Sequence, residues 1–275
     1  MVKIIHLLVI LFVLSLSAVN AQKKILFVMS AAKGLKLANG KTYQETGVFL
    51  SEFYLAYKAI ERSGYDIDFA TPNGIVSSID KESFDKKYWK GGDTFIAEAT
   101  AFIKQNSEFN KPLTLERAVE NRSQYSGLVI PGGQGLMVDL FYDPNVSKLL
   151  KHFSQKGKPI GLICHAPALI LSIPKEENPF MGYKVNSVTR LEEFFIESFV
   201  MKGKPKNRKI GKQLRKLGLK YVKGRPAANF AVLDRELVSS QNPYSNQAFN
   251  KLYIEALNEY KLKGTLKPIG NEIKQ

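Results

Sequence analysis

The stretch PIGLICHAPA, residues 159–168, joins a compact apolar run to the only cysteine of this 275-residue chain. A short apolar run between polar or turn residues is typical of a strand that is buried on both faces of a sheet. Cys164 therefore stands at the carboxyl end of a predicted buried strand, and His165 follows it directly. We expect a helix to start at or just after the cysteine.

Other apolar runs bounded by polar or turn residues occur along the chain. Apolar runs at 23–30, 65–71 and 126–130 predict three more strands, the last of which runs into the glycine turn PGGQG. Between the first two strands a polar loop reaches Thr46, and VFLSEFYLAYKAIERSG (48–64) then has helical spacing. Thr46 is its expected N-cap and Gly64 its expected stop.

The remaining segments complete an alternating pattern of strands and helices, which favours a doubly wound, mostly parallel α/β sheet of the flavodoxin-like kind with helices on both faces. We expect one domain over 22–262 and a tail over 263–275. The other predicted elements are one or two surface helices in 75–122, helices at about 145–156, 190–201 and 245–262, a short strand at 185–189, and a hairpin over 230–243 that turns near Asp234 and Arg235.

The first 21 residues have the pattern of a secretory signal peptide that is cut after Ala21. Lys3 gives the positive start, and the apolar core is about 13 to 15 residues, short for a membrane span of about 20. The alternative is a membrane anchor. We therefore expect an exported protein, periplasmic or secreted, and its single cysteine leaves no partner for an internal disulfide.

The net charge of +15 is concentrated in residues 202–225, which hold eleven Lys or Arg and no acidic residue. We interpret this stretch first as a solvated helix face with flanking loops. The alternative is contact with an anionic surface such as lipid headgroups or cell-wall polymer. Nucleic acid is a poor partner for an exported protein, so none is expected.

The carboxyl ends of parallel strands are where such sheets bind ligands, and two strands here end in PGGQG and CHAP. A cysteine at a strand-to-helix corner is expected to have a lowered pKa and to act as a thiolate nucleophile. The backbone N–H groups of Gly133 and His165 could then form an oxyanion hole. The alternative is a cysteine that only packs at the end of a strand.

Two glutamates are candidates to assist the cysteine. Glu52 shares the apolar helix stripe with Phe49 and Phe53, so it is either a buried, protonated carboxyl that can shuttle protons or a side chain at the rim. Thr189 and Glu192 have the spacing of a capping box.

Glu193 has no such duty, so it could orient a histidine. If a Cys-His-acid set exists, His165 must be its base.

Five stretches together resemble the DJ-1/PfpI superfamily, the class I glutamine amidotransferase-like fold, and most closely its branch of Hsp31-like chaperones and glutathione-independent glyoxalases. The resemblance spans nearly all of the chain after residue 21, in the family's order. The stretches are ETGVFLSEFYLAYKAIERSGYDIDFATPNG (45–74), IPGGQGLMVDLFYDP (130–144), GKPIGLICHAPA (157–168), NSVTRLEE (186–193) and LVSSQNPYS (237–245).

The resemblance implies roles for five residues. Cys164 matches the nucleophile, His165 its partner, Glu52 the buried glutamate, Glu193 the third acidic residue and Gly133 the oxyanion-side glycine. The chain departs from the family where Gln134 replaces a histidine, where Ala166 replaces a glycine, and where Leu55-Ala56 stand in place of a His-Pro pair.

The resemblance implies a cofactor-free, metal-free enzyme for small reactive carbonyls, a glyoxalase III-like lyase that converts methylglyoxal to D-lactate. It also implies a homodimer. Two alternatives stay open: a cysteine-dependent hydrolase or amidase, and a non-enzymatic stress chaperone or redox sensor.

Overall fold

Seven strands form the central sheet of the computed structural model, which describes residues 24–267. All neighbours in the sheet are parallel except the edge pair β10 and β11. The predicted doubly wound, mostly parallel sheet is therefore confirmed. In spatial order the strands are β10 (Ala231–Asp234), β11 (Leu237–Ser240), β7 (Ile160–Ile163), β6 (Gly127–Ile130), β1 (Lys24–Val28), β4 (Asp66–Thr71) and β5 (Leu113–Thr114).

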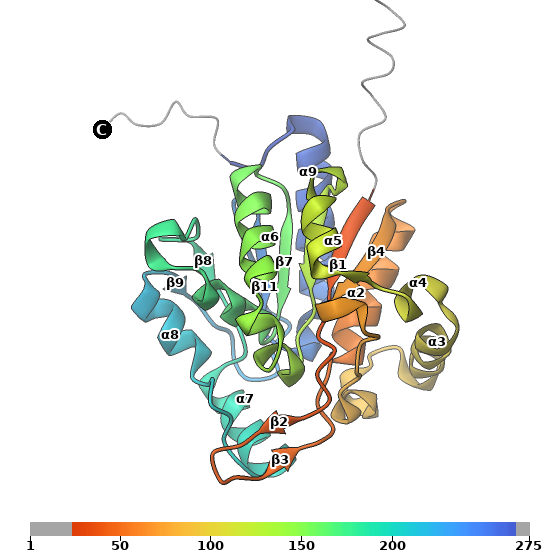
Figure 1. Ribbon diagram of the computed structural model, residues 1–275, viewed down its shortest axis with the longest axis vertical. Helices are drawn as coiled ribbons and strands as arrows, with labels where there is room; N and C mark the ends of the chain where they lie inside the picture. Colours follow the sequence, from red (N-terminus) through yellow and green to blue (C-terminus); the bar gives the residue numbers. More distant parts are fainter. Residues whose placement is uncertain (1–23, 268–275) are drawn as a thin grey trace, which may run out of the picture.

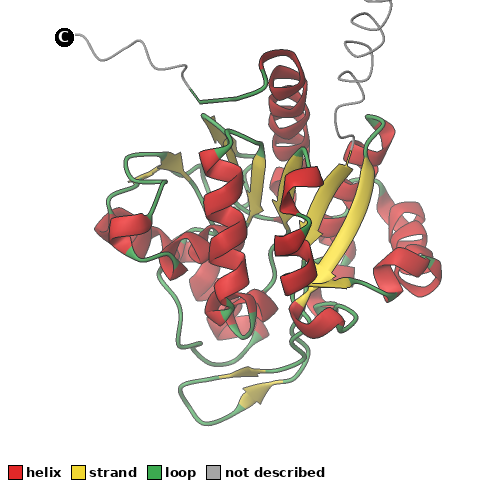
Figure 2. Ribbon diagram, turned by 45° about the horizontal axis from the view of Figure 1, so that its top comes forward, coloured by secondary structure: helices red, strands yellow, loops and turns green. Residues whose placement is uncertain are grey.

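Helices cover both faces of this sheet (Figure 1). Helices α2 and α9 pack against each other on one face, and α5 and α6 pack together on the other. The view coloured by secondary structure shows the strands between these helical layers (Figure 2). The helices are α2 (Leu50–Arg62), α3 (Gly92–Gln105), α4 (Ser107–Asn110), α5 (Leu115–Glu120), α6 (Pro144–Gln155), α7 (Arg190–Phe195), α8 (Ile210–Leu217) and α9 (Asn246–Lys263).

The central strands owe their position to continuous apolar runs. Every residue of β6 and β7 is buried, and so are the last four residues of β1. A strand with two buried faces must bury its polar backbone too, and pairing with a strand on each side satisfies it. The three strands therefore lie in the interior of the sheet, and their carboxyl ends converge on one edge.

The start of α2 differs from the prediction. Thr46 is not the N-cap: the helix begins at Leu50, and Phe49 precedes it without a side-chain cap. Two contacts hold the chain extended before that point, a β-bridge between Val48 and Ile79 and a hydrogen bond from the Phe49 N–H to the Gly132 carbonyl. Tertiary pairing therefore overrides the local capping signal.

Two pairs of short strands lie outside the main sheet. The predicted strand at 185–189 is only β8 (Lys184–Val185), which pairs with β9 (Lys220–Tyr221). The polar loop expected before Thr46 contains a hairpin of β2 (Leu35–Lys36) and β3 (Thr42–Tyr43).

The hairpin and the segment after α7 form a cap over the carboxyl ends of the strands. A capping box of Thr189 and Glu192 starts α7, as predicted, and a π-helix, Ile196–Val200, continues it. Leu35 and Leu37 from the hairpin pack on Met201 in a small separate cluster. Figure 1 shows α7, β2 and β3 together at one end of the molecule.

Two predictions concern the chain ends. The signal peptide over 1–21 lies outside the described residues, and so do residues 268–275 of the predicted tail. Within 24–267, no helix combines the length and apolar character that crossing a bilayer requires. Helix α9 ends at Lys263, one residue after the predicted end of the last helix at 262.

Candidate active site

Cys164 occupies the sharp corner at which β7 ends. Its φ angle is +57°, in the left-handed region that a non-glycine residue enters only at a cost. Two backbone hydrogen bonds fix this conformation: the Cys164 N–H donates to the Ser240 carbonyl over 2.8 Å, and the Val188 N–H donates to the Cys164 carbonyl over 2.9 Å. The predicted elbow is therefore present, although a 3-10 helix, Ala166–Ser172, follows it in place of an α-helix.

Glu52 lies in the first turn of α2 and is completely buried. The rim position considered from the sequence is therefore wrong. Its Oε2 accepts a 3.0 Å hydrogen bond from the Gly132 N–H, while Oε1 accepts none from an N–H or O–H group of the described residues and the carboxyl faces the Cys164 thiol. A buried carboxyl oxygen without such a donor, next to a thiol, is an acceptor that is free for a substrate proton.

The glycine turn of PGGQG brings these groups together. A Cβ on Gly132 would stand 2.5 Å from Glu52 Oε2 and 2.7 Å from the Cβ of Cys164, so only glycine fits there. Gly133 has a φ of +108°, and a Cβ on it would stand 2.1 Å from the Gly47 carbonyl oxygen. The backbone corner expected from the sequence therefore lies directly against both the carboxyl and the cysteine.

The proposed oxyanion donors are consistent with this geometry. No backbone carbonyl of residues 24–267 accepts a hydrogen bond from the Gly133 or His165 N–H. The His165 N–H interacts with the sulfur and acts to lower the pKa of Cys164, against the larger effect of burial. The Gly133 N–H is therefore available to a developing negative charge, and the His165 N–H would have to turn from the sulfur to join it.

His165 is held between the cysteine and Gln134. Its Nδ1 lies 3.1 Å from Cys164 Sγ, and its Nε2 lies 2.9 Å from Gln134 Nε2. The group of the Gln134 amide that faces Nε2 fixes the ring tautomer: the NH₂ group places the ring proton on Nδ1, facing the sulfur, whereas Oε1, which is buried without a partner among the described residues, would place it on Nε2. In the first tautomer the imidazole donates to the sulfur, and in the second Nδ1 accepts the thiol proton.

Burial sets the protonation of all three groups. It raises the pKa of Glu52 to about 8 and lowers the pKa of His165 to about 4, so both are neutral at pH 7. Burial, and secondly the negative charge of an ionised Glu52, raises the pKa of Cys164 well above that of a free thiol. The expectation of a lowered cysteine pKa is therefore wrong for this closed site, because desolvation outweighs the effect of the backbone corner.

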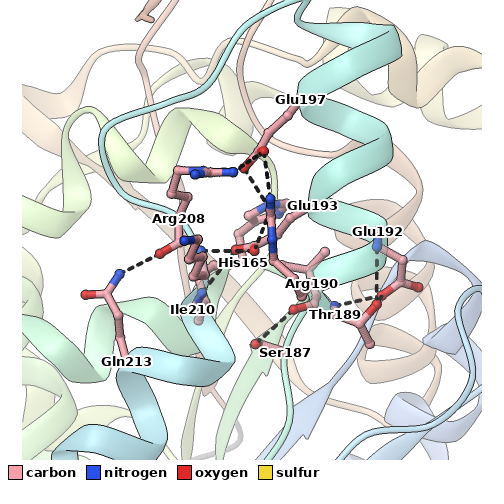
Figure 3. A network of polar contacts seen from close by, with 12 residues as sticks. His165, Ser187, Thr189, Arg190, Glu192, Glu193, Glu197, Arg208, Ile210 and Gln213 are labelled. Atoms are coloured by element: carbon pink, nitrogen blue, oxygen red, sulfur yellow. Dashed lines mark hydrogen bonds and ion pairs between the residues drawn. The ribbon is translucent and has the colours of Figure 1, made fainter. Parts of the chain in front are cut away.

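Glu193 does not orient His165. Its carboxylate accepts hydrogen bonds from the backbone N–H groups of Lys209 and Ile210 at 2.9 and 3.0 Å, which anchors the start of α8. No hydrogen bond links it to His165 among the residues that the structure describes. Figure 3 shows these contacts beside Glu197, on which Arg190 and Arg208 converge. The role expected for Glu193 beside the histidine is therefore corrected to a structural one.

Glu192 is the acidic residue of α7 that borders the site. Besides its part in the capping box, its Oε1 accepts hydrogen bonds from the Ala227 N–H and from the side chains of Gln241 and Asn242. It also lines the cavity above Cys164. The capping role of Glu192 could be predicted from the sequence. Its position at the cavity could not, because it depends on hydrogen bonds with segments around residues 227 and 241 that are distant in the chain.

A cavity of about 300 Å³ opens above the cysteine. Its wall is mostly apolar and aromatic, and the charged side chains in it are carboxylates: Asp80, Glu82 and Glu192. Burial raises the pKa of Asp80 to about 7. Sequence analysis missed this wall, because it is assembled from well-separated segments. Its apolar and aromatic members include Tyr43, Phe49, Tyr88, Val188, Phe195, Ile196, Val200, Met201 and Tyr244.

Within 24–267, no group of three or more His, Cys, Asp or Glu side chains is arranged to hold a metal ion. Cys164 and His165 line the cavity, and the buried Glu52 carboxyl lies beside Cys164. This set can add sulfur to an electrophilic carbon and move a proton next to it.

Comparisons with known proteins agree on one family. The model of the family described as ThiJ/PfpI family-like matches residues 43–189. The chain is 26% identical over 255 residues to the protein/nucleic acid deglycase HchA of Pseudomonas aeruginosa strain UCBPP-PA14, covering 87% of this chain and 82% of that protein. It is 27% identical over 244 residues to the HchA of Staphylococcus aureus strain bovine RF122, covering 85% and 80%.

Solved structures share the fold. Glyoxalase III of Candida albicans aligns with a TM-score of 0.67 at 24% identity, covering 86% of this chain and 98% of that one. The Rapid Encystment Protein 24 KDa of Francisella tularensis aligns with a TM-score of 0.70 at 21% identity, covering 85% and 98%. At these identities the likeness establishes the fold and nothing more.

Proposed function

The chain belongs to the ThiJ/PfpI family, in the Hsp31-like branch of the DJ-1/PfpI superfamily, and from this membership we propose that it is a cysteine-dependent enzyme acting on small reactive carbonyl compounds. The resemblance predicted from the sequence is thereby confirmed at the level of the family. The names of its relatives, deglycase and glyoxalase III, support reactive carbonyls as the substrate class.

One observation carries the proposal: the fully buried Glu52 carboxyl lies beside Cys164, and Cys164 lines the cavity. A structural cysteine needs no such neighbour, and a carboxyl that is buried without full hydrogen bonding is costly to fold. A group with a pKa of about 8 is mostly protonated at pH 7 but ionises at little cost, which suits repeated proton transfer.

We propose the glyoxalase reaction as the specific activity. The Cys164 sulfur bonds to the aldehyde carbon of methylglyoxal, and the thiol proton ends on the aldehyde oxygen, which gives a hemithioacetal. Ionised Glu52 removes the proton from that carbon, which gives an enediolate, and returns it to the neighbouring carbon while the hydroxyl proton moves from the first oxygen to the second, which leaves a thioester. Water then cleaves the C–S bond, releasing D-lactate and restoring the thiol. The Gly133 N–H faces the oxygen that becomes negative, and the His165 N–H turns from the sulfur to join it.

The experiment is methylglyoxal turnover by wild-type protein and by Cys164→Ala and Glu52→Gln. Each variant is expected to lose all measurable lactate formation while keeping its circular-dichroism spectrum. Glu120→Gln, an exposed glutamate on α5, is the matched control and should retain full activity. Turnover that persists in either site variant contradicts the mechanism, and turnover of amide or ester substrates in place of methylglyoxal supports a hydrolase.

Three further predictions remain proposals. A homodimer is tested by sedimentation velocity, and export after cleavage at Ala21 by N-terminal sequencing of the protein from its host. The relatives are named protein/nucleic acid deglycases, so the expectation that nucleic acid is not a partner needs its own test with glycated oligonucleotides.

A further inference from the structure

Helix α7 and its π-helical continuation carry their charges inward and their aromatic rings outward. Glu193 and Glu197 are each only 4% exposed and are held by backbone N–H groups and by two arginines. Phe194, Phe195 and Phe199 are 48%, 51% and 67% exposed. A helix that faced only water would have the opposite arrangement.

The three rings form one continuous apolar surface. Phe195 and Phe199 stack with their centroids 5.7 Å apart, and Phe194 contacts Phe195 edge-on at 6.1 Å. Leu191 extends the surface at 49% exposure. Contiguous exposed apolar side chains on a folded domain mark a contact surface for another molecule. We call these four residues the phenylalanine face.

Lysines border this face from two directions. Lys202, Lys204 and Lys206 follow it in the chain and are all exposed. The β2–β3 hairpin is joined to this loop by a hydrogen bond from the Ala38 N–H to the Lys204 carbonyl, over 2.8 Å, and by a bridge between Leu37 and Pro205. The hairpin adds two more exposed lysines, Lys36 and Lys41.

These five lysines are not neutralised by carboxylates. None of them makes an ion pair with a carboxylate within residues 24–267, whereas Arg190 and Arg208 nearby are both paired with Glu197. Helix α7 and the hairpin lie at the same end of the molecule (Figure 1). This end therefore presents aromatic rings and unpaired positive charge together.

We propose that this end of the molecule docks on an anionic lipid surface, with the phenylalanine face entering the boundary between headgroups and acyl chains and the five lysines contacting the headgroups. Apolar rings flanked by lysines are the chemistry of proteins that lie on membranes. Each lysine near a negatively charged leaflet adds to the attraction, and salt weakens it.

Two other occupants fit the observations less well. In a two-fold dimer across this face, the same unpaired lysines would approach one another without intervening carboxylates, which is repulsive. Single-stranded nucleic acid stacks its bases on separate ring faces along a groove, whereas these rings pack against one another. The docking does not depend on Cys164, so it stands or fails independently of the proposed enzymatic function.

The test is co-sedimentation with vesicles. The chain from Gln22 onward is used, because it contains every described residue and omits the apolar segment at 1–21, which would itself bind lipid. Vesicles of equal parts phosphatidylglycerol and phosphatidylcholine are compared with vesicles of phosphatidylcholine alone. We expect binding to the anionic vesicles only, and we expect it to weaken as salt is added.

Two double variants probe the two halves of the surface. Phe194→Ser with Phe199→Ser removes apolar area and leaves Phe195, which lines the catalytic cavity, unsubstituted. Lys204→Glu with Lys206→Glu reverses charge. Each should weaken vesicle binding about tenfold or more. Lys104→Glu with Lys111→Glu changes the net charge equally at exposed positions elsewhere and should leave binding unchanged.

Three results would overturn the proposal. The first is no preference for anionic vesicles, and the second is equal loss of binding in the Lys104/Lys111 control. The third is binding of a single-stranded oligonucleotide, or self-association in sedimentation, that is lost in the Phe194/Phe199 variant while vesicle binding is unaffected. The Cys164→Ala protein should bind vesicles as the wild type does.

Discussion

The Glu52 carboxyl and the Cys164 side chain meet across the space of one missing side chain: a Cβ on Gly132 would stand 2.5 Å from Glu52 Oε2 and 2.7 Å from Cys164 Cβ. The same glycine donates its N–H to Oε2. One residue therefore fixes both the distance between the two reacting groups and the orientation of the carboxyl.

Gly132→Ala should consequently reduce carbonyl turnover about a hundredfold, because the added methyl group forces Glu52 and Cys164 apart. Overpacking of the core should also lower the free energy of unfolding by about 1–3 kcal/mol. Turnover and urea unfolding are measured on the same sample. Gly182→Ala is the control for activity: its Cβ meets no atom within 4 Å but its φ is +76°, so it should lose stability through backbone strain and keep wild-type turnover. Wild-type turnover in Gly132→Ala would refute the shared geometry.

The contact between Gln134 and His165 predicts how the reactivity of the cysteine can be changed. Gln134→Glu puts a carboxyl group beside His165 Nε2; when that carboxyl is ionised it can only accept, so the ring carries a proton there. The pKa of His165 then rises from about 4, and an imidazolium next to the sulfur lowers the pKa of Cys164.

Alkylation by iodoacetamide measures this effect at a single site, because the chain has one cysteine. The rate for Gln134→Glu should reach its plateau at a lower pH than the rate for the wild type. Gln134→Met, which has a similar size and no hydrogen bond to the ring, should not shift the profile downward. Identical profiles for the wild type and Gln134→Glu would show that residue 134 does not control the imidazole.

Parts of the site could be predicted from local sequence because strand ends carry it. The apolar runs before Gly132 and Cys164 place both residues at the same edge of a parallel sheet, and the apolar stripe of α2 places Glu52 among buried side chains. Each of these inferences needs only the spacing of apolar residues within one helix or strand and the knowledge that neighbouring strands run parallel.

The rest depended on contacts that no local pattern encodes. Glu193 accepts hydrogen bonds from the start of α8 because the loop after residue 201 folds back against α7. The sequence alone does not indicate which of the two adjacent glutamates, 192 or 193, this loop contacts. The hairpin of β2 and β3 has two residues in each strand, too few for a period. The raised pKa of Cys164 follows from burial, which the whole fold determines.

The cavity wall predicts a preference among substrates. Its charged side chains are carboxylates, and Asp80, with a pKa of about 7, gains its negative charge as the pH rises through neutrality. An α-oxoaldehyde that ends in a carboxylate should therefore have a kcat/KM tenfold or more below that of its methyl ester. The penalty should grow above pH 7. Equal values for the acid and the ester would mean that these carboxylates do not face the bound substrate.

The raised pKa of Glu52 should also make the free energy of unfolding depend on pH. Its pKa rises from 4.5 to about 8 on folding, so the folded state holds a proton that the unfolded chain releases between these values. Wild-type stability is thus unaffected by Glu52 below about pH 4.5 and falls as the pH rises to about 8. At about 1.4 kcal/mol per pKa unit, the loss reaches about 5 kcal/mol.

Glu52→Gln removes this titration and keeps an oxygen for the Gly132 N–H, so the inactive variant should be more stable than the wild type above neutral pH. Urea unfolding from about pH 4 to about pH 9 checks the sign, since the difference must vanish at the acidic end. The titration of Asp80 is common to both proteins and cancels. Glu120→Gln should follow the wild-type curve throughout. If Glu52→Gln is less stable at every pH, the carboxyl is ionised and satisfied in the folded protein, and a neutral proton carrier at residue 52 is ruled out.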